Sequence, residues 1–137
     1  MGFATNNMKE KKKIGCFILS RLSSSRLPGK ALLTIKGKPL IQHIIERARL
    51  VSLADVIVLC TSVEKSDDAL ESIAKENNIE VFRGSLNDVL ERFLGAAQKF
   101  NVDYFVVFSG DNIFCDPELM DLGLNQMINN GLDFIKL

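Results

Sequence analysis

The sequence has one histidine, and its three cysteines form no C-x-x-C pair. His43 lies on the polar side of a predicted helix, where a lone histidine is usually structural or solvated, so we assign it no role. Without a second histidine, a Ser/His/Asp or Cys/His nucleophile system is not expected, and covalent hydrolase chemistry is set aside. The cysteine spacing predicts no metal–thiolate site.

The chain also lacks an excess of charge and a long apolar run. Lys plus Arg and Asp plus Glu number 17 each, so no global field would attract nucleic acid, and an anion must be held by a local cluster. No run is long enough to cross a bilayer, and no apolar signal segment is present. With an odd number of cysteines, these absences predict a cytoplasmic protein without a membrane or nucleic-acid partner.

The length and composition predict one domain. The 137 residues are 47% hydrophobic, which is enough for a core on both faces of a sheet. Residues 1–13 are polar and without apolar periodicity, so they are expected to form a flexible leader, and residues 14–137 the domain. A nucleic-acid-binding arm is disfavoured, because the basic run in this leader is short, has no aromatic residue and is interrupted by Glu10.

Apolar periodicity predicts alternating strands and helices along the domain. Short apolar runs predict strands at residues 14–19, 56–60, 79–82 and 104–108. Helical spacing of apolar residues appears between them, at residues 40–48, 69–74 and 89–97. A fourth helix is expected to begin at Asp116, which suits the N-cap position, with Pro117 in the first turn. Residues 133–136 are predicted to start another strand.

The order of these elements predicts an α/β fold, a Rossmann-like three-layer α/β/α sandwich with a mainly parallel sheet. Nearly continuous apolar strands are buried on both faces, as in parallel sheets covered by helices. Open sheets of this kind bind ligands at the carboxyl ends of their strands. Three polar segments fall at that edge, namely residues 21–30, 61–62 and 109–112.

The segment after the first strand reads R-L-S-S-S-R-L-P-G-K and places Arg21, Arg26 and Lys30 on one loop. Three cations this close repel one another unless an anion lies among them. Small residues, including Ser24 and Gly29, would let backbone N–H groups approach that anion, so the loop predicts a polyphosphate site. A solvated surface loop is the plain alternative, and it does not require the L-P-G turn.

Two common phosphate-binding motifs do not fit this loop. A Walker P-loop needs glycine where Ser24 stands and Ser or Thr where Ala31 stands. No G-x-G-x-x-G motif of a dinucleotide-binding site is present. The loop therefore predicts phosphate binding of another kind.

Asp111 is the candidate metal ligand. It follows a predicted strand through Gly110, so its carboxylate is expected in the ligand crevice, where it would help hold Mg²⁺ against a triphosphate. The alternative is a turn aspartate that bonds its own backbone, which is common in S-G-D-N sequences.

The loop resembles the phosphate-binding signature of the sugar cytidylyltransferases, R-x-x-S-x-R-L-P-G-K. The similarity continues through Thr61-Ser62, through Arg83-Gly84-Ser85, through Asp88-Val89-Leu90 with Arg92, and through Gly110-Asp111. Within this superfamily the chain is most similar to the branch of spore coat polysaccharide and acylneuraminate cytidylyltransferases, with the 3-deoxy-manno-octulosonate cytidylyltransferases as relatives.

The resemblance implies an enzyme that transfers CMP from CTP to a sugar acid, acylneuraminate-like or octulosonate-like, and releases pyrophosphate with the help of Mg²⁺. Arg21, Lys30 and Asp111 would be catalytic. The nucleotide would be bound by Arg21, Ser24, Arg26, Gly29, Lys30, Thr61 and Ser62. Arg83, Asp88 and Arg92 would contact the substrate, although spacing alone indicates only an i,i+4 ion pair between Asp88 and Arg92.

The resemblance covers only the N-terminal half of such enzymes. We therefore expect a truncated version of the nucleotide-diphospho-sugar transferase fold, with its free edge covered by a missing C-terminal half or by a second copy in a homodimer. Two alternatives to the enzyme stay open. One is a CTP-binding fragment or subunit without the sugar-binding half, and the other is a nucleotidyltransferase that uses another base.

Overall fold

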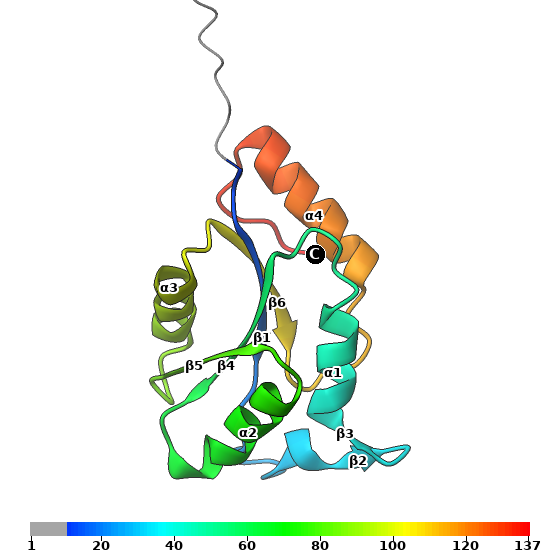
Figure 1. Ribbon diagram of the computed structural model, residues 1–137, viewed down its shortest axis with the longest axis vertical. Coiled ribbons are helices and arrows are strands. Elements are labelled where there is room, and N and C mark those ends of the chain that lie inside the picture. The colour runs from blue at the N-terminus through cyan, green and yellow to red at the C-terminus, as the bar shows by residue number, and fades with distance from the viewer. Residues whose placement is uncertain (1–10) are drawn as a thin grey trace, which may run out of the picture.

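Strand β1 (Ile14–Leu19) lies inside a four-stranded parallel sheet with the order β5-β4-β1-β6. The computed structural model describes residues 11–137 (Figure 1). The other strands are β4 (Val56–Ser62), β5 (Glu80–Gly84) and β6 (Tyr104–Ser109). The four strands predicted from apolar runs are therefore confirmed. Most of the expected leader, residues 1–13, lies outside the described residues.

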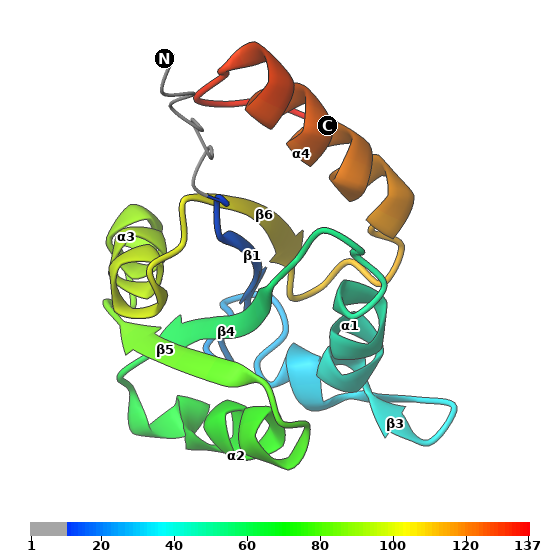
Figure 2. The ribbon, with the colours of Figure 1, turned by 45° about the horizontal axis from the view of Figure 1, so that its top comes forward.

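Helices cover both faces of the sheet (Figures 1 and 2). The helix α3 (Val89–Phe100) packs on one face, where Phe17, Val58 and Cys60 form a core cluster with Ala96. Side chains of three further helices join the larger cluster on the other face: α1 (Leu40–Ala48), α2 (Asp68–Glu76) and α4 (Pro117–Asn130). This is the predicted three-layer arrangement, and it buries β1 on both sides.

The apolar stripe of α1 explains how that helix is placed. Its five buried residues lie within the helix predicted from apolar spacing at residues 40–48: Leu40, Ile41, Ile44, Ile45 and Ala48. Spaced three and four residues apart, they form one continuous face, which packs on the sheet. No described helix is both long and apolar enough to cross a membrane.

Two helices begin at aspartates whose carboxylates accept hydrogen bonds from backbone N–H groups of the first turn. Asp116 accepts hydrogen bonds from the backbone of Glu118 and Leu119, as the sequence predicted for α4. Asp88 accepts from the backbone of Glu91 at 2.9 Å and so caps α3. Each bond satisfies an N–H group that has no partner inside the helix.

Sequence reasoning missed four smaller elements, three of which lie along the chain between the end of the loop of residues 21–30, the Arg-rich loop, and α1. A 3-10 helix, η1 (Lys30–Leu32), ends the loop, and β2 (Thr34–Ile35) and β3 (Lys38–Pro39) form a short hairpin before α1. A second 3-10 helix, η2 (Lys65–Asp67), precedes α2. Such short elements have too few residues to show a period in the sequence.

The strand predicted at residues 133–136 is wrong. The described chain has no strand there, because it turns at Gly131 and lies back against α4. A Cβ atom at Gly123 in α4 would meet the side chain of Leu137 at 3.0 Å, so the tail packs on the helix rather than on the edge of β6.

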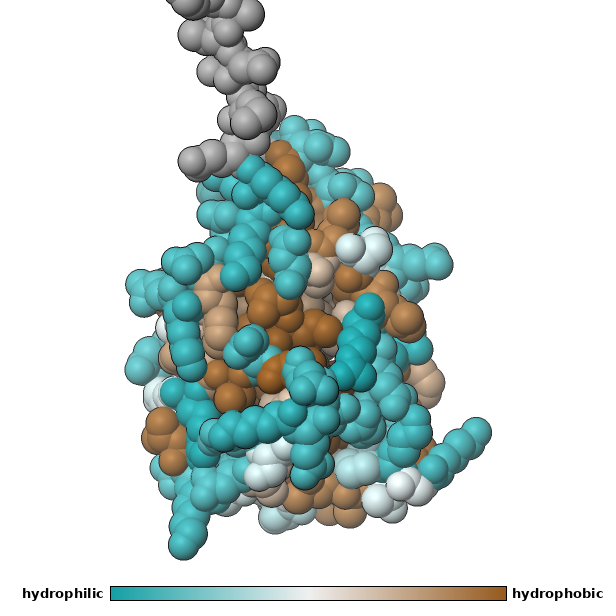
Figure 3. Space-filling model, in the orientation of Figure 1, coloured by the Kyte–Doolittle hydropathy of each residue, from teal (hydrophilic) through white to brown (hydrophobic). Residues whose placement is uncertain are grey.

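One face of the molecule combines an apolar centre with a polar rim. Figure 3 shows hydrophobic residues gathered between α3 and α1, above β5, with hydrophilic residues around them. Here β5 pairs with β4 only from Val58 onward, so Val56 and Ile57 have no partner on the β5 side. Both side chains are partly exposed as a result.

Candidate functional site

A cavity of about 510 Å³ opens at the carboxyl ends of the strands. Its lining comes from the loop after β1, from the loop between β5 and α3, from the first turns of α3 and from the end of β6. This is the edge at which the sequence predicted a ligand site. Four basic side chains line it: Arg21, Arg26, Lys30 and Arg92.

The Arg-rich loop is a closed turn rather than an extended segment. The backbone N–H of Gly29 donates to the carbonyl of Leu22 at 2.9 Å, which joins the two ends of the loop. Gly29 has a φ of 72°, in the left-handed region that glycine adopts without strain. Inside the loop, the hydroxyl of Ser24 accepts from the backbone of Leu27 at 3.4 Å. The turn therefore keeps Arg21, Arg26 and Lys30 on the same cavity.

Arg21 reaches across the cavity to the loop that leads into α3. Its Nη1 donates to the carbonyl of Leu86 at 3.3 Å. None of the ion pairs among residues 11–137 includes Arg21 or Arg26. Their positive charges are therefore available to a ligand.

Lys30 and Asp111 face each other across the mouth of the cavity. The Nζ of Lys30 lies 2.9 Å from Oδ2 of Asp111, and the hydroxyl of Ser109 donates to the other carboxylate oxygen. These two donors, Ser109 first, hold the pKa of Asp111 below its usual range. Asp111 is thus an ionised carboxylate near neutral pH, with about half of its side chain exposed.

Arg92, predicted as a substrate contact, lines the cavity although it is only 2% exposed. Its Nη2 makes one long hydrogen bond, 3.5 Å, to the carbonyl of Leu86, whereas Nε and Nη1 are buried and bond none of the described residues. Burial, and after it the nearby charge of Arg21, lower the pKa of Arg92. A buried guanidinium without a carboxylate partner is costly, and an anion in the cavity would offset that cost.

The structure removes Thr61 and Ser62 from the predicted nucleotide contacts. Both are fully buried at the end of β4, and neither lines the cavity. The hydroxyl of Ser62 donates to the carboxylate of Asp67 instead. The prediction assumed that every strand end opens into the crevice, but the turn between β4 and α2 covers this one.

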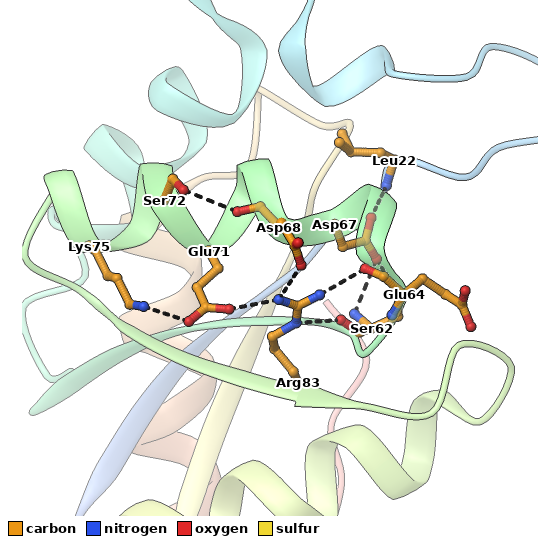
Figure 4. A network of polar contacts seen from close by, with 9 residues as sticks. All are labelled: Leu22, Ser62, Glu64, Asp67, Asp68, Glu71, Ser72, Lys75 and Arg83. Carbon is orange, nitrogen blue, oxygen red and sulfur yellow. Dashed lines mark hydrogen bonds and ion pairs between the residues drawn. The ribbon is translucent and has the colours of Figure 1, made fainter.

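Arg83 is also not where a substrate contact was predicted. Its guanidinium bonds Asp68 and Glu71 on α2, each at 2.7 Å, and the carbonyls of Ser62 and Glu64 (Figure 4). The bonds to Glu71 and Asp68 raise the pKa of Arg83. With these partners Arg83 fastens β5 to α2, and it does not line the cavity.

Asp88 differs from both of the roles that the sequence suggested. Its carboxylate caps α3 through Glu91 and forms no ion pair with Arg92 among the described residues. It does not line the cavity either, although its neighbours Asn87 and Val89 do. Asp88 therefore positions the helix that carries Arg92.

Sequence reasoning missed several polar groups of the lining. Ser23, Asn87 and Ser109 all line the cavity, and the hydroxyl of Ser23 is buried without a partner in the described chain. Ser23 and Ser109 stood inside segments already singled out, so their position was a usable signal. For Asn87 the sequence offered no signal, because the loop after β5 carries no pattern that predicts which of its side chains points into the cavity.

The described residues offer Asp111 as the one predicted metal ligand, and no group of three His, Cys, Asp or Glu residues in residues 11–137 gathers around a possible ion. Mg²⁺ nevertheless suits such a site, since it is commonly bound by one or two carboxylates together with substrate phosphates and water. An ionised, half-exposed Asp111 beside a cationic cavity fits that donor set.

Comparison with protein families matches residues 16–136 to the family described as cytidylyltransferase. Among curated proteins, the chain is similar to the spore coat polysaccharide biosynthesis protein SpsF of Bacillus subtilis, with 33% identity over 121 residues. The match covers 85% of this chain and 50% of SpsF.

Solved structures give the same result. A cytidylyltransferase from Leptospira borgpetersenii superposes with a TM-score of 0.82 at 36% identity, over 88% of this chain and 50% of that one. The CMP:2-keto-3-deoxy-manno-octonic acid synthetase complexed with CTP superposes with a TM-score of 0.73 at 28% identity, over 88% and 49%. The chain thus spans about half the length of the relatives it matches.

Proposed function

Because this chain belongs to the cytidylyltransferase family, we propose that its cationic cavity binds the triphosphate of CTP and that the protein transfers CMP to a sugar acid, releasing pyrophosphate. Arg21, Arg26, Lys30 and Arg92 neutralise the phosphates, and the backbone of the Arg-rich loop supplies further donors. The relative solved with CTP supports the choice of nucleotide.

The unpaired guanidinium of Arg92 is the observation that carries this proposal. Arg92 forms no ion pair among the described residues, and burial together with the charge of Arg21 outweighs the favourable charge of Asp67, so an anion in the cavity would stabilise the guanidinium. Each charge-assisted hydrogen bond to a phosphate contributes about 1.5 to 3 kcal/mol. Micromolar binding needs about 8 kcal/mol beyond an association cost of at least about 4 kcal/mol, so about four to eight such bonds are required, which four basic side chains and the loop backbone can supply.

Charge neutralisation and positioning are also what this reaction needs. Attack of a sugar hydroxyl on the α-phosphate of CTP develops charge on the phosphate oxygens and on the leaving pyrophosphate, and basic side chains that are already in place stabilise it. Lys30 is suited to this role, because a phosphate can replace Asp111 as its partner.

Mg²⁺ is part of the proposal, with Asp111 as the residue that would hold it. When bound, the ion would neutralise phosphate charge and orient the triphosphate. The Lys30–Asp111 contact fits this role, since a Lys30 that turned toward a phosphate would leave the Asp111 carboxylate free for the ion.

A second candidate is a CTP-binding unit that does not catalyse alone. The chain spans about half the length of the relatives it matches, and the basic side chains of its cavity account for nucleotide binding only. The two candidates share the nucleotide site and differ only in turnover.

Calorimetry with CTP, GTP, UTP and ATP in the presence of Mg²⁺ tests the nucleotide assignment, and pyrophosphate release with a panel of sialic-acid-like and octulosonate-like acids tests turnover. The proposal expects preferential CTP binding and pyrophosphate release with one class of acid. CTP binding without turnover selects the second candidate. Equal binding of all four nucleotides removes the cytidylyl assignment, and no binding of any removes both candidates.

A further inference from the structure

Asp67 is a fully buried carboxylate that does not perform the task its position suggests. It stands at the N-cap of α2, yet its side chain makes no capping hydrogen bond to the first turn of that helix. Asp68 follows it in the first turn of α2, and its carboxylate bonds Arg83.

The carboxylate of Asp67 instead joins the Arg-rich loop to the end of β4 (Figure 4). Its Oδ1 accepts from the backbone N–H of Leu22 at 2.7 Å, and its Oδ2 accepts from the backbone N–H of Ser62 at 3.2 Å and from the Ser62 hydroxyl. With three donors, the buried charge is well satisfied.

Leu22 is the residue through which the loop is held. Its N–H donates to Asp67, and its carbonyl accepts from the N–H of Gly29. The peptide groups on both sides of Leu22 are therefore fixed by hydrogen bonds. The peptide bond whose N–H is held by Asp67 is the one that joins Leu22 to Arg21. Because this peptide group is fixed, the position of the Arg21 Cα atom, from which the side chain extends, is restricted.

The turn that carries Asp67 is itself fastened from the other side. Arg83 on β5 donates to the carbonyls of Ser62 and Glu64 and pairs with Asp68 and Glu71, while Lys75 pairs with Glu71 (Figure 4). A continuous set of hydrogen bonds therefore runs from β5 through the turn to the Arg-rich loop.

From these contacts we propose that Asp67 is a positioning residue, which holds the loop of residues 21–30 in its anion-binding arrangement through the N–H of Leu22. The proposal rests on the proposed function for its consequence, tighter triphosphate binding. The anchoring of the loop is a property of the chain itself.

The variant Asp67→Asn separates positioning from simple electrostatics, because the two predict opposite signs. Asp67 is near enough to Arg92 to act on its charge, so removing the carboxylate makes the cavity more positive and by charge alone tightens anion binding. In the side-chain amide, however, an NH₂ group replaces one oxygen and faces the N–H of Leu22 or the donors of Ser62. A loosened loop weakens binding.

Calorimetry with inorganic tripolyphosphate, well below the melting temperature, measures that sign. We expect the Asp67→Asn variant to bind about ten- to hundredfold more weakly than the wild type, the effect of losing one hydrogen bond to a charged group. The matched control is Asp68→Asn, which removes the same charge one residue away without a contact to the loop; Arg83 keeps its bonds to Glu71 and to the Ser62 and Glu64 carbonyls, so this variant should bind as well as the wild type. Equal or tighter binding by the Asp67→Asn variant overturns the proposal.

Amide hydrogen exchange at Leu22, followed by NMR, tests the anchor without any ligand. In the wild type this amide should be protected, and in the folded Asp67→Asn variant it should exchange at least tenfold faster, with Asp68→Asn as the control. An unprotected Leu22 amide in the wild type overturns the proposal even if the variant does not fold. If the wild type binds no polyphosphate while Leu22 is protected, the proposed function fails and the anchor stands.

Discussion

At the scale of single residues, two arginines that the sequence placed in the same class have opposite surroundings. Arg83 satisfies its guanidinium with two carboxylates and two carbonyls, whereas Arg92 is buried with one long bond to a carbonyl. The family motif gave both as substrate contacts, and no pattern in the sequence separates them. The difference arises from α2, which supplies carboxylates to Arg83 and none to Arg92.

The two arginines should therefore respond differently to replacement by methionine, which keeps the apolar length of the side chain. We expect Arg83→Met to lower the free energy of unfolding by about 0.5 to 1.5 kcal/mol, because it removes hydrogen bonds to the partly exposed carboxylates of Asp68 and Glu71 and to the carbonyl of the buried Ser62. Arg92→Met should leave the unfolding free energy unchanged or raise it while weakening CTP binding at least tenfold. Urea unfolding and calorimetry on both variants measure this. A large loss of stability in Arg92→Met would show that its charge is already compensated.

Asp111 gives a prediction about pH. Hydrogen bonds from Ser109 and Lys30 lower the pKa of its carboxylate in the folded state. Their contribution to stability is therefore complete above the unfolded pKa of about 3.9 and is lost as the pH falls through the lower, folded pKa. An NMR titration of the carboxyl carbon should show a midpoint below 3.9 in the wild type and a higher one in Lys30→Met. A wild-type midpoint at or above 3.9 would contradict this structure of the site.

At the scale of elements, the site depends on how closely strand ends approach one another. Gly110 follows β6, and its N–H donates to the carbonyl of Leu19 at 2.7 Å. A Cβ at this position would lie 2.5 Å from the same carbonyl oxygen and 2.7 Å from the Cβ of Ser20. Only glycine therefore lets the loop that carries Asp111 come this close to the end of β1.

Gly110→Ala should push these two strand ends apart. We expect the free energy of unfolding to fall by about 1 to 3 kcal/mol, the usual cost of overpacking, and the contact between Lys30 and Asp111 to lengthen. Urea unfolding measures the first effect and a crystal structure of the variant the second. An unchanged unfolding free energy would mean that the close approach is not maintained in solution.

The elements were more predictable from the sequence than the directions of their side chains. β1 and α1 formed where the sequence predicted them. The strand is buried on both faces and the helix along one stripe, and each kind of burial leaves a recognisable apolar pattern in the sequence. Thr61 and Ser62 were misplaced because the following turn, fastened by Asp67, covers them, and a contact between residues 22 and 67 leaves no local pattern. The tail after Gly131 was misjudged because β propensity says nothing about whether a neighbouring strand is available.

At the scale of the whole molecule, the core is divided by the sheet into two clusters. Cys16 belongs to the larger cluster and Cys60 to the one under α3, and both are fully buried. Burial raises the pKa of each thiol to about 12. Cys115 is partly exposed in the loop before α4.

The rate at which each thiol is labelled should follow the burial of its cysteine. At pH 8 a chromogenic disulfide reagent should modify Cys115 readily, while Cys16 and Cys60 react only as fast as the protein unfolds. In urea above the unfolding midpoint, all three should react quickly. Mass spectrometry of the labelled peptides identifies each site. Rapid labelling of Cys16 or Cys60 in the native protein would show that the sheet opens locally on one face.

The chain carries no net charge, so anion binding depends on the local gathering of basic side chains around one cavity. A crystal structure of the protein with CTP tests this most directly. We predict phosphate oxygens within hydrogen-bonding distance of Arg21 and Lys30 and close to Arg92, with Lys30 moved away from Asp111. A nucleotide bound elsewhere, with the Lys30–Asp111 pair intact and the cavity empty, would contradict the account.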